Sequence, residues 1–212
     1  MPYRSVTFLS EGLALEGVLQ VPEGEGPFPG VVVCHPHPRM GGDMDNNVVL
    51  ASCRGLIRQG VACLSFNFRG VGGSQGVSQG TEAEVRDAMD AVEYLRGLQE
   101  VDASRLGLLG YSFGAGITLQ AMAKGLPVQA FGVIAGLSSR SQGSASLQLP
   151  LPKLFIGGDQ DQMAPGEQFL TLTKQVADPK EAHQIKGGDH FLWGHEEEVA
   201  KLVGGFFSRC LG

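Results

Sequence analysis

The sequence predicts an α/β fold in which a mainly parallel, twisted sheet carries helices on both faces. Short apolar runs rich in β-branched residues alternate with longer segments whose apolar residues recur at helical spacing. This alternation is typical of βαβ units, whose right-handed crossovers place helices on both sides of one sheet. The 212 residues contain no internal repeat, low-complexity tract or linker. We therefore expect one domain over residues 1–212.

The expected elements follow one another along the chain. Residues 6–21 alternate loosely around a glycine, which predicts an antiparallel hairpin, and the apolar run 31–34 predicts a strand buried on both faces. Residues 81–98 form the clearest helical pattern. Further strands are expected at residues 62–68, 105–109, 128–135, 153–156 and 181–186, and further helices at residues 48–59, 113–124, 165–176 and 196–207.

Composition and charge narrow the function classes. The net charge is −6 and no basic cluster occurs, which argues against a nucleic-acid partner. No stretch is apolar enough to cross a bilayer, and the N-terminal segment lacks the pattern of a signal peptide, so we expect a cytoplasmic protein without a membrane partner. The four cysteines show no regular spacing that would indicate a zinc site or a disulfide framework.

The strongest chemical signal is the segment Gly110-Tyr111-Ser112-Phe113-Gly114. It matches the G-x-S-x-G nucleophile elbow, it follows an apolar strand, and it opens a helix, which is the context that this motif requires. The glycines keep Cβ atoms out of a sharp strand-to-helix turn, so that the serine hydroxyl is exposed. We predict that Ser112 is a nucleophile, which needs an adjacent base oriented by a third group.

His190 is the best candidate for the base, because its loop follows the last expected strand at the sheet edge where the elbow lies. His183 falls inside that strand, and His195 begins the last helix. In the chain order Ser, Asp, His, the acid comes from the loop after residue 156. That loop offers Asp159 and Asp161, of which only one can hold the imidazole, and we favour Asp161.

Several segments together resemble the small, lidless α/β-hydrolases related to dienelactone hydrolase. They are GYSFG, GGDQD, GGDHF, CHPHPRMGGDMDNNVV and FNFRGVGGSQG. The resemblance covers nearly the whole chain and implies an α/β-hydrolase fold with no separate lid domain. It also implies that Asp161, the second aspartate of its loop, is the triad acid. Dienelactone hydrolase itself uses a cysteine nucleophile, so a dienelactone substrate is not implied for a chain with Ser112.

The loop His35-Pro36-His37-Pro38 follows a strand where such hydrolases supply half of an oxyanion hole. Proline has no N–H, so we expect the backbone N–H of His37 to be one donor and that of Phe113 the other. Arg39 is the alternative donor.

Another interpretation makes metal ligands of residues in and after this loop, namely His35, His37, Asp43 and Asp45. A Ser-Asp-His set leaves such a metal no role, so we expect neither a metal nor a cofactor. Arg69 is expected to tie loops together through Asp87 or through Asp43 or Asp45, although it could instead meet a substrate anion.

These features predict a serine hydrolase that cleaves small, short-acyl carboxylic esters through an acyl-enzyme intermediate, with water as the second substrate. Thioester hydrolysis is equally accessible chemistry, and amide cleavage has a poorer leaving group. A catalytically silent binding protein is the alternative from another class. The sequence does not specify an oligomeric state.

Overall fold

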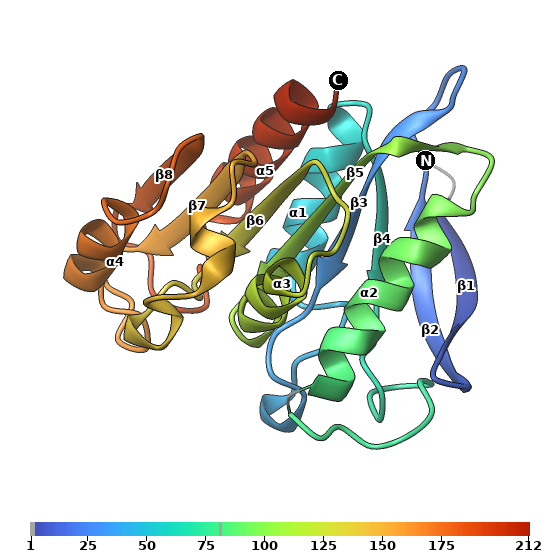
Figure 1. Cartoon of the computed structure of the whole chain (residues 1–212), viewed down its shortest axis with the longest axis horizontal. Helices are drawn as coiled ribbons and strands as arrows, with labels where there is room; N and C mark the ends of the chain where they lie inside the picture. Colours follow the sequence, from blue (N-terminus) through green and yellow to red (C-terminus); the bar gives the residue numbers. More distant parts are fainter. Residues whose placement is uncertain (1–2, 81) are drawn as a thin grey trace.

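One mixed sheet of eight strands organises the chain, in the order β1-β2-β4-β3-β5-β6-β7-β8 (Figure 1). The structure is a computed structural model that describes residues 3–80 and 82–212. Strands β3 to β8 are parallel, while β2 pairs antiparallel with both β1 and β4. The strands are β1 (Tyr3–Ser10), β2 (Leu13–Gln20), β3 (Phe28–Cys34), β4 (Ala62–Phe66), β5 (Val101–Tyr111), β6 (Ala130–Ile134), β7 (Lys153–Gly158) and β8 (Lys180–Ile185).

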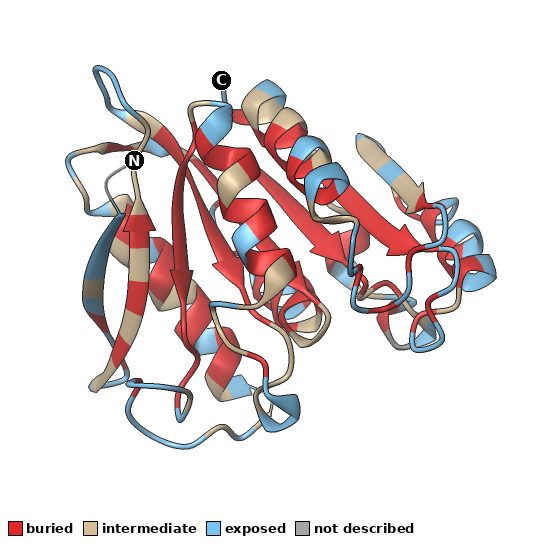
Figure 2. Cartoon of the chain, turned by 180° about the vertical axis from the view of Figure 1, so that it is seen from behind, coloured by how far each residue is buried: buried red, intermediate tan, exposed pale blue. Residues whose placement is uncertain are grey.

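Helices cover both faces of the sheet, as predicted, and each face has its own apolar core. Neighbouring residues of β3 alternate between them: Val32 belongs to the core on the side of α2, α3 and α4, whereas Val31 belongs to the core on the side of α1 and α5. Figure 2 shows the central strands buried between these layers, whereas the edge strands β1 and β8 are partly exposed. The helices are α1 (Asn47–Arg58), α2 (Glu82–Arg96), α3 (Phe113–Ala123), α4 (Gly166–Thr173) and α5 (Glu196–Leu211), and short 3₁₀ turns span Pro38–Met40, Ser139–Ser141 and Ala145–Gln148.

The predicted antiparallel hairpin is confirmed, and its turn explains the glycine in the pattern. Glu11 and Gly12 both have positive φ, 48° and 83°, as a two-residue hairpin turn requires. Strand β5 begins at Val101, earlier than predicted, because its polar first residues do not form an apolar run. The predicted start of the helix at Thr81 lies outside the described residues. Between β6 and β7 the described chain holds only two 3₁₀ turns and no inserted lid domain.

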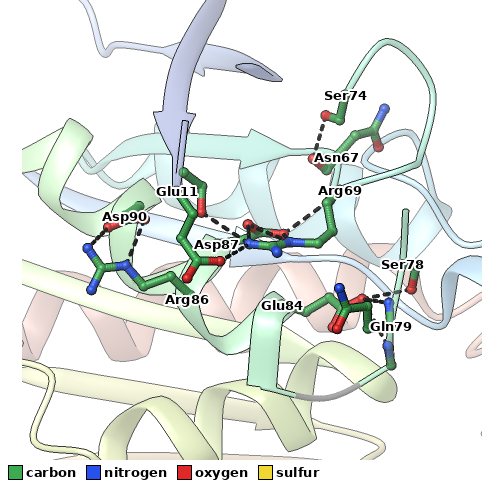
Figure 3. Close-up of polar contacts among 12 residues, drawn as sticks. Glu11, Asn67, Arg69, Ser74, Ser78, Gln79, Glu84, Arg86, Asp87 and Asp90 are labelled. Carbon is green, nitrogen blue, oxygen red and sulfur yellow. Dashed lines mark hydrogen bonds and ion pairs between the residues drawn. The ribbon is translucent and has the colours of Figure 1, made fainter. Parts of the chain in front are cut away.

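Arg69 contacts Asp87, which was one of its predicted partners. This buried pair anchors the loop after β4 (Figure 3). The guanidinium donates to Asp87 at 2.7 Å and to Glu11 at 3.0 Å, which ties the loop to α2 and to the β1–β2 turn. Farther along, buried Glu84 accepts from the backbone N–H of Gly80 at 3.0 Å. Both ends of the loop are therefore held by carboxylates of the neighbouring elements.

No helix in the described part of the chain combines the length and the apolar character needed to cross a membrane.

Candidate active site

Ser112 occupies a strained turn between β5 and α3. Its φ of 54° and ψ of −111° lie outside the usual regions for a residue with a side chain, at a cost of about 1–3 kcal/mol. The turn is possible because its glycines have no side chain, and the backbone around them packs too closely to admit one. A Cβ on Gly110 would lie 2.0 Å from the carbonyl oxygen of Gly114, and one on Gly114 would lie 2.4 Å from that of Cys34. This geometry is the strand-turn-helix predicted for the elbow.

Three predicted side chains form one hydrogen-bonded chain at the carboxyl edge of the sheet. The Ser112 Oγ lies 2.9 Å from His190 Nε2, and His190 Nδ1 lies 2.9 Å from Asp161 Oδ2. Ser112 follows β5, Asp161 follows β7 and His190 follows β8, so three separate loops converge here. Asp161 and His190 are 3% and 8% exposed, which screens their contact from solvent.

Asp161 is held as an ionised acceptor. Burial opposes its ionisation, but hydrogen bonds from His190 and from the backbone N–H groups of Ala164 and Met163 outweigh it and lower the pKa of Asp161. Because an ionised carboxylate only accepts, His190 Nδ1 carries the proton and Nε2 presents its lone pair to Ser112. The alternative acid, Asp159, is exposed and accepts from the backbone N–H of Gly187 at 2.7 Å.

The carboxylate next to His190 and the other two histidines considered as bases lie outside this hydrogen-bonded chain. Asp189, beside the base, accepts from the N–H groups of Phe191 and Leu192 and so shapes the loop. His183 lies in β8, and His195 precedes α5, where the sequence places them.

Tyr111 is a site residue that the sequence analysis missed. Its hydroxyl donates to the carbonyl oxygen of His190 at 2.9 Å, which fixes the loop that carries the predicted base. Burial raises the pKa of Tyr111, with the charges of Asp161 and Asp189 adding to the effect, so the hydroxyl stays a donor. A tyrosine at the end of an apolar strand was the available signal, because a buried phenol needs a hydrogen-bond partner.

The two N–H groups predicted to form an oxyanion hole are free to donate. Phe113 is the first residue of α3, so its N–H has no acceptor within the helix. No described residue accepts from the N–H of His37 either. The His37 imidazole accepts from the N–H of Arg39 at 3.1 Å and packs on the Phe113 ring at 4.9 Å between centroids. The ring of His37 is therefore used in holding its own loop.

His35 connects this loop to the segment that follows β4. Its Nδ1 donates to the Pro36 carbonyl oxygen at 2.6 Å, and its Nε2 accepts from the N–H of Phe68 at 3.1 Å. Burial lowers the pKa of His35 to about 4, which keeps the ring neutral and suited to both contacts. Among the residues described, no three His, Cys, Asp or Glu side chains gather into a group that could hold a metal ion.

Ser112 borders two hollows of unequal size. The larger, about 430 Å³, runs along α3 toward Ser138, Ser141 and Ser144 in the loop after β6. The smaller, about 70 Å³, lies between the loop of residues 36–46 and Phe191. His37, Met40, Met163 and His190 border both. Of the described residues that line the two hollows, none is Asp, Glu, Lys or Arg.

The family model described as X-Pro dipeptidyl-peptidase (S15 family) matches residues 11–186. The Rickettsia prowazekii protein RP471, of unknown function, is 31% identical over 183 residues, which cover 82% of this chain and 76% of that protein. The structure of XC6422 from Xanthomonas campestris, described as an α/β serine hydrolase without a lid, superposes with a TM-score of 0.84 at 26% identity and covers 100% of this chain and 97% of its own.

A shorter match is to the esterase EstD of Thermotoga maritima, 34% identical over 111 residues, which cover 49% of this chain and 26% of EstD. None of these relatives bears the name dienelactone hydrolase, so that part of the resemblance stays a prediction. The predicted lidless α/β-hydrolase fold is confirmed. The chain belongs to the S15 family, whose model is that of X-Pro dipeptidyl-peptidases, and it has the fold of an α/β serine hydrolase.

Proposed function

We propose that the protein is a serine esterase that hydrolyses small, uncharged, short-acyl carboxylic esters. The observation that carries the proposal is the hydrogen-bonded chain from Ser112 through His190 to Asp161, beside hollows with no charged residue in their described lining. A neutral lining suits a substrate without a formal charge, because a buried charge needs a partner. The partners of the reaction are then an ester and water.

In the first step, His190 Nε2 takes the proton of the Ser112 hydroxyl as the oxygen attacks the ester carbonyl. The new positive charge on the imidazole is stabilised by Asp161, whose carboxylate already accepts from Nδ1. The N–H groups of Phe113 and His37 receive the negative charge that develops on the carbonyl oxygen. Prolines on both sides of His37 stiffen that loop before the charge develops.

The first tetrahedral intermediate then collapses: its bond to the alkoxy oxygen breaks, His190 gives its proton to the leaving alcohol, and the acyl group stays on Ser112. Water then enters beside His190, which removes a proton from it as the water attacks the acyl carbonyl. Collapse of this second intermediate releases the acid and returns the proton to Ser112. The strained backbone of Ser112 keeps its hydroxyl beside His190 and the two hollows through both steps.

Peptide hydrolysis is the second candidate, because the matching family model is named for a dipeptidyl-peptidase. An enzyme that releases an X-Pro dipeptide has to accommodate a cationic α-amino group. A carboxylate is the usual partner for such a cation, and the described lining of the two hollows contains none. A lining without a carboxylate favours an uncharged ester over a peptide with a free amino terminus. Thioesters are uncharged as well, so the lining does not distinguish them from esters.

The test combines labelling with turnover. A serine-directed fluorophosphonate should label Ser112, as located by mass spectrometry, and the protein should hydrolyse methyl butanoate. Ser112→Ala should abolish both, whereas Ser104→Ala, on the distant and exposed start of β5, should change neither. Label on another residue, with Ser112→Ala still active, would refute the proposal. Faster cleavage of Ala-Pro-p-nitroanilide or of butanoyl-CoA would transfer the assignment to a peptidase or a thioesterase, and no label or turnover would indicate a silent member.

A further inference from the structure

The two hollows beside Ser112 differ about sixfold in volume, 430 Å³ against 70 Å³. They also lie toward different layers of the fold. The larger follows α3, on the face of the sheet that α2 covers, and the smaller is bordered by Asn46, which caps α1, and by Phe191, on the way to α5. An ester carbonyl bound at Ser112 has two substituents, its acyl chain and its alkoxy group. The two hollows offer one place for each.

The position of the base decides which substituent enters which hollow. The alkoxy oxygen has to lie beside His190 Nε2 to receive a proton, and the alcohol leaves before water enters at the same nitrogen. The smaller hollow is built on the loop of His190, with Phe191 as one wall and Tyr111, which holds that loop, as another. The larger hollow also touches His190, but most of its lining lies along α3 and the loop after β6, and the first N–H of α3 points to the carbonyl oxygen in the proposed mechanism.

We propose that the acyl chain occupies the larger hollow along α3 and the alkoxy group the smaller one, so that the preferred substrates are short-chain acyl esters of the smallest alcohols. This inference rests on the proposed esterase function. The smaller hollow leaves room for a methyl or ethyl group between Phe191 and the loop of residues 36–46. The larger hollow accommodates the longer carbon chain of the acyl group.

Gly116 sets the depth of the acyl hollow. It lies within α3 and lines the larger hollow, and a Cβ built on it meets no heavy atom within 4 Å. A larger side chain at residue 116 therefore enters open space rather than the packed core. Leucine also favours a helix interior more than glycine does, so Gly116→Leu should fold. Phe191→Ala is the complementary change, because it removes a wall of the smaller hollow only.

Isomeric esters test the orientation without a difference in composition. The protein should hydrolyse methyl butanoate with a kcat/KM about tenfold or more above that for propyl acetate, since the fit of single methylenes in a pocket is worth roughly that factor. Gly116→Ala should reduce this ratio slightly and Gly116→Leu should bring it near one, through loss of methyl butanoate hydrolysis. Phe191→Ala should raise propyl acetate hydrolysis. Gly205→Leu, a matched change in α5 beside only the end of Arg209, should leave the ratio unchanged.

Equal rates for the two isomers, or a preference for propyl acetate, would overturn the orientation while leaving the esterase function intact. A parent ratio that Gly116→Leu does not alter would also overturn it. Failure to hydrolyse either isomer, together with no labelling of Ser112 by the fluorophosphonate, would refute the proposed function itself and this inference with it.

Discussion

Replacement of Asp161 by asparagine should disable the base without removing it. Asp161 Oδ1 accepts from the N–H groups of Met163 and Ala164 at 2.7 and 2.9 Å, and the carbonyl oxygen of an asparagine can keep both contacts. The amide nitrogen then faces His190 Nδ1, where Oδ2 now accepts at 2.9 Å. Two donors cannot share that contact, so the imidazole proton has to move to Nε2. The lone pair that takes the Ser112 proton is lost.

The expected loss follows from this change of tautomer. In a serine protease the same substitution lowers kcat about 10⁴-fold, which corresponds to about 5.4 kcal/mol of activation free energy. Asp161→Asn should approach this value, whereas Asp159→Asn, whose carbonyl oxygen can keep the exposed contact with the N–H of Gly187, should stay within about tenfold of the parent protein.

Turnover of methyl butanoate is the assay, with the released acid quantified by chromatography so that a large loss remains measurable. Circular dichroism checks that both variants are folded. If Asp161→Asn stays within about tenfold of the parent protein, or if Asp159→Asn is the more damaged variant, the assignment of the acid is wrong.

Three further predictions concern the loops around the site. His37→Ala keeps its backbone N–H and should reduce kcat by about tenfold at most, whereas a loss in the range of about 10²–10³, the cost of deleting an oxyanion donor, would mean that the imidazole takes part. Burial lowers the pKa of His35 from 6.5 to about 4, so between these values the unfolded chain binds a proton that the folded chain does not, and stability falls as the pH drops through this window. Between about pH 7 and 4.5, the free energy of unfolding measured in urea should fall by about 2–3 kcal/mol less for His35→Gln than for the parent protein. Equal pH profiles for the two proteins would contradict this account. Asp87→Ala leaves the buried Arg69 with only the exposed Glu11 as an ionic partner and should cost about 3–5 kcal/mol in the same assay. Asp90→Ala, whose partner is exposed, should cost about 1 kcal/mol or less, and equal costs would refute the argument.

The sequence by itself determined the fold class and the order of its elements. Alternation of apolar runs with helical patterns is a local property, so it can be read without knowledge of distant contacts. The two glycines of the elbow and the prolines around His37 are also local restrictions on the backbone. For that reason the turn at Ser112 and the loop of His37 could be predicted. Element ends were less accurate, as at Val101, because polar residues can pair in a sheet without an apolar pattern.

Tertiary structure decided the features that depend on segments far apart in the chain. Asp159 and Asp161 lie in one loop, and the preference for Asp161 as the partner of His190 rested on no distance between the loops. The contact went to Asp161 because N–H groups later in its loop orient that carboxylate toward His190, while Asp159 turns to Gly187. The contact of Tyr111 with the base loop and the unequal hollows are likewise products of convergence between strands, α3 and the loops after β3, β6 and β8. No local pattern records such distances, because each is set by packing across the whole sheet.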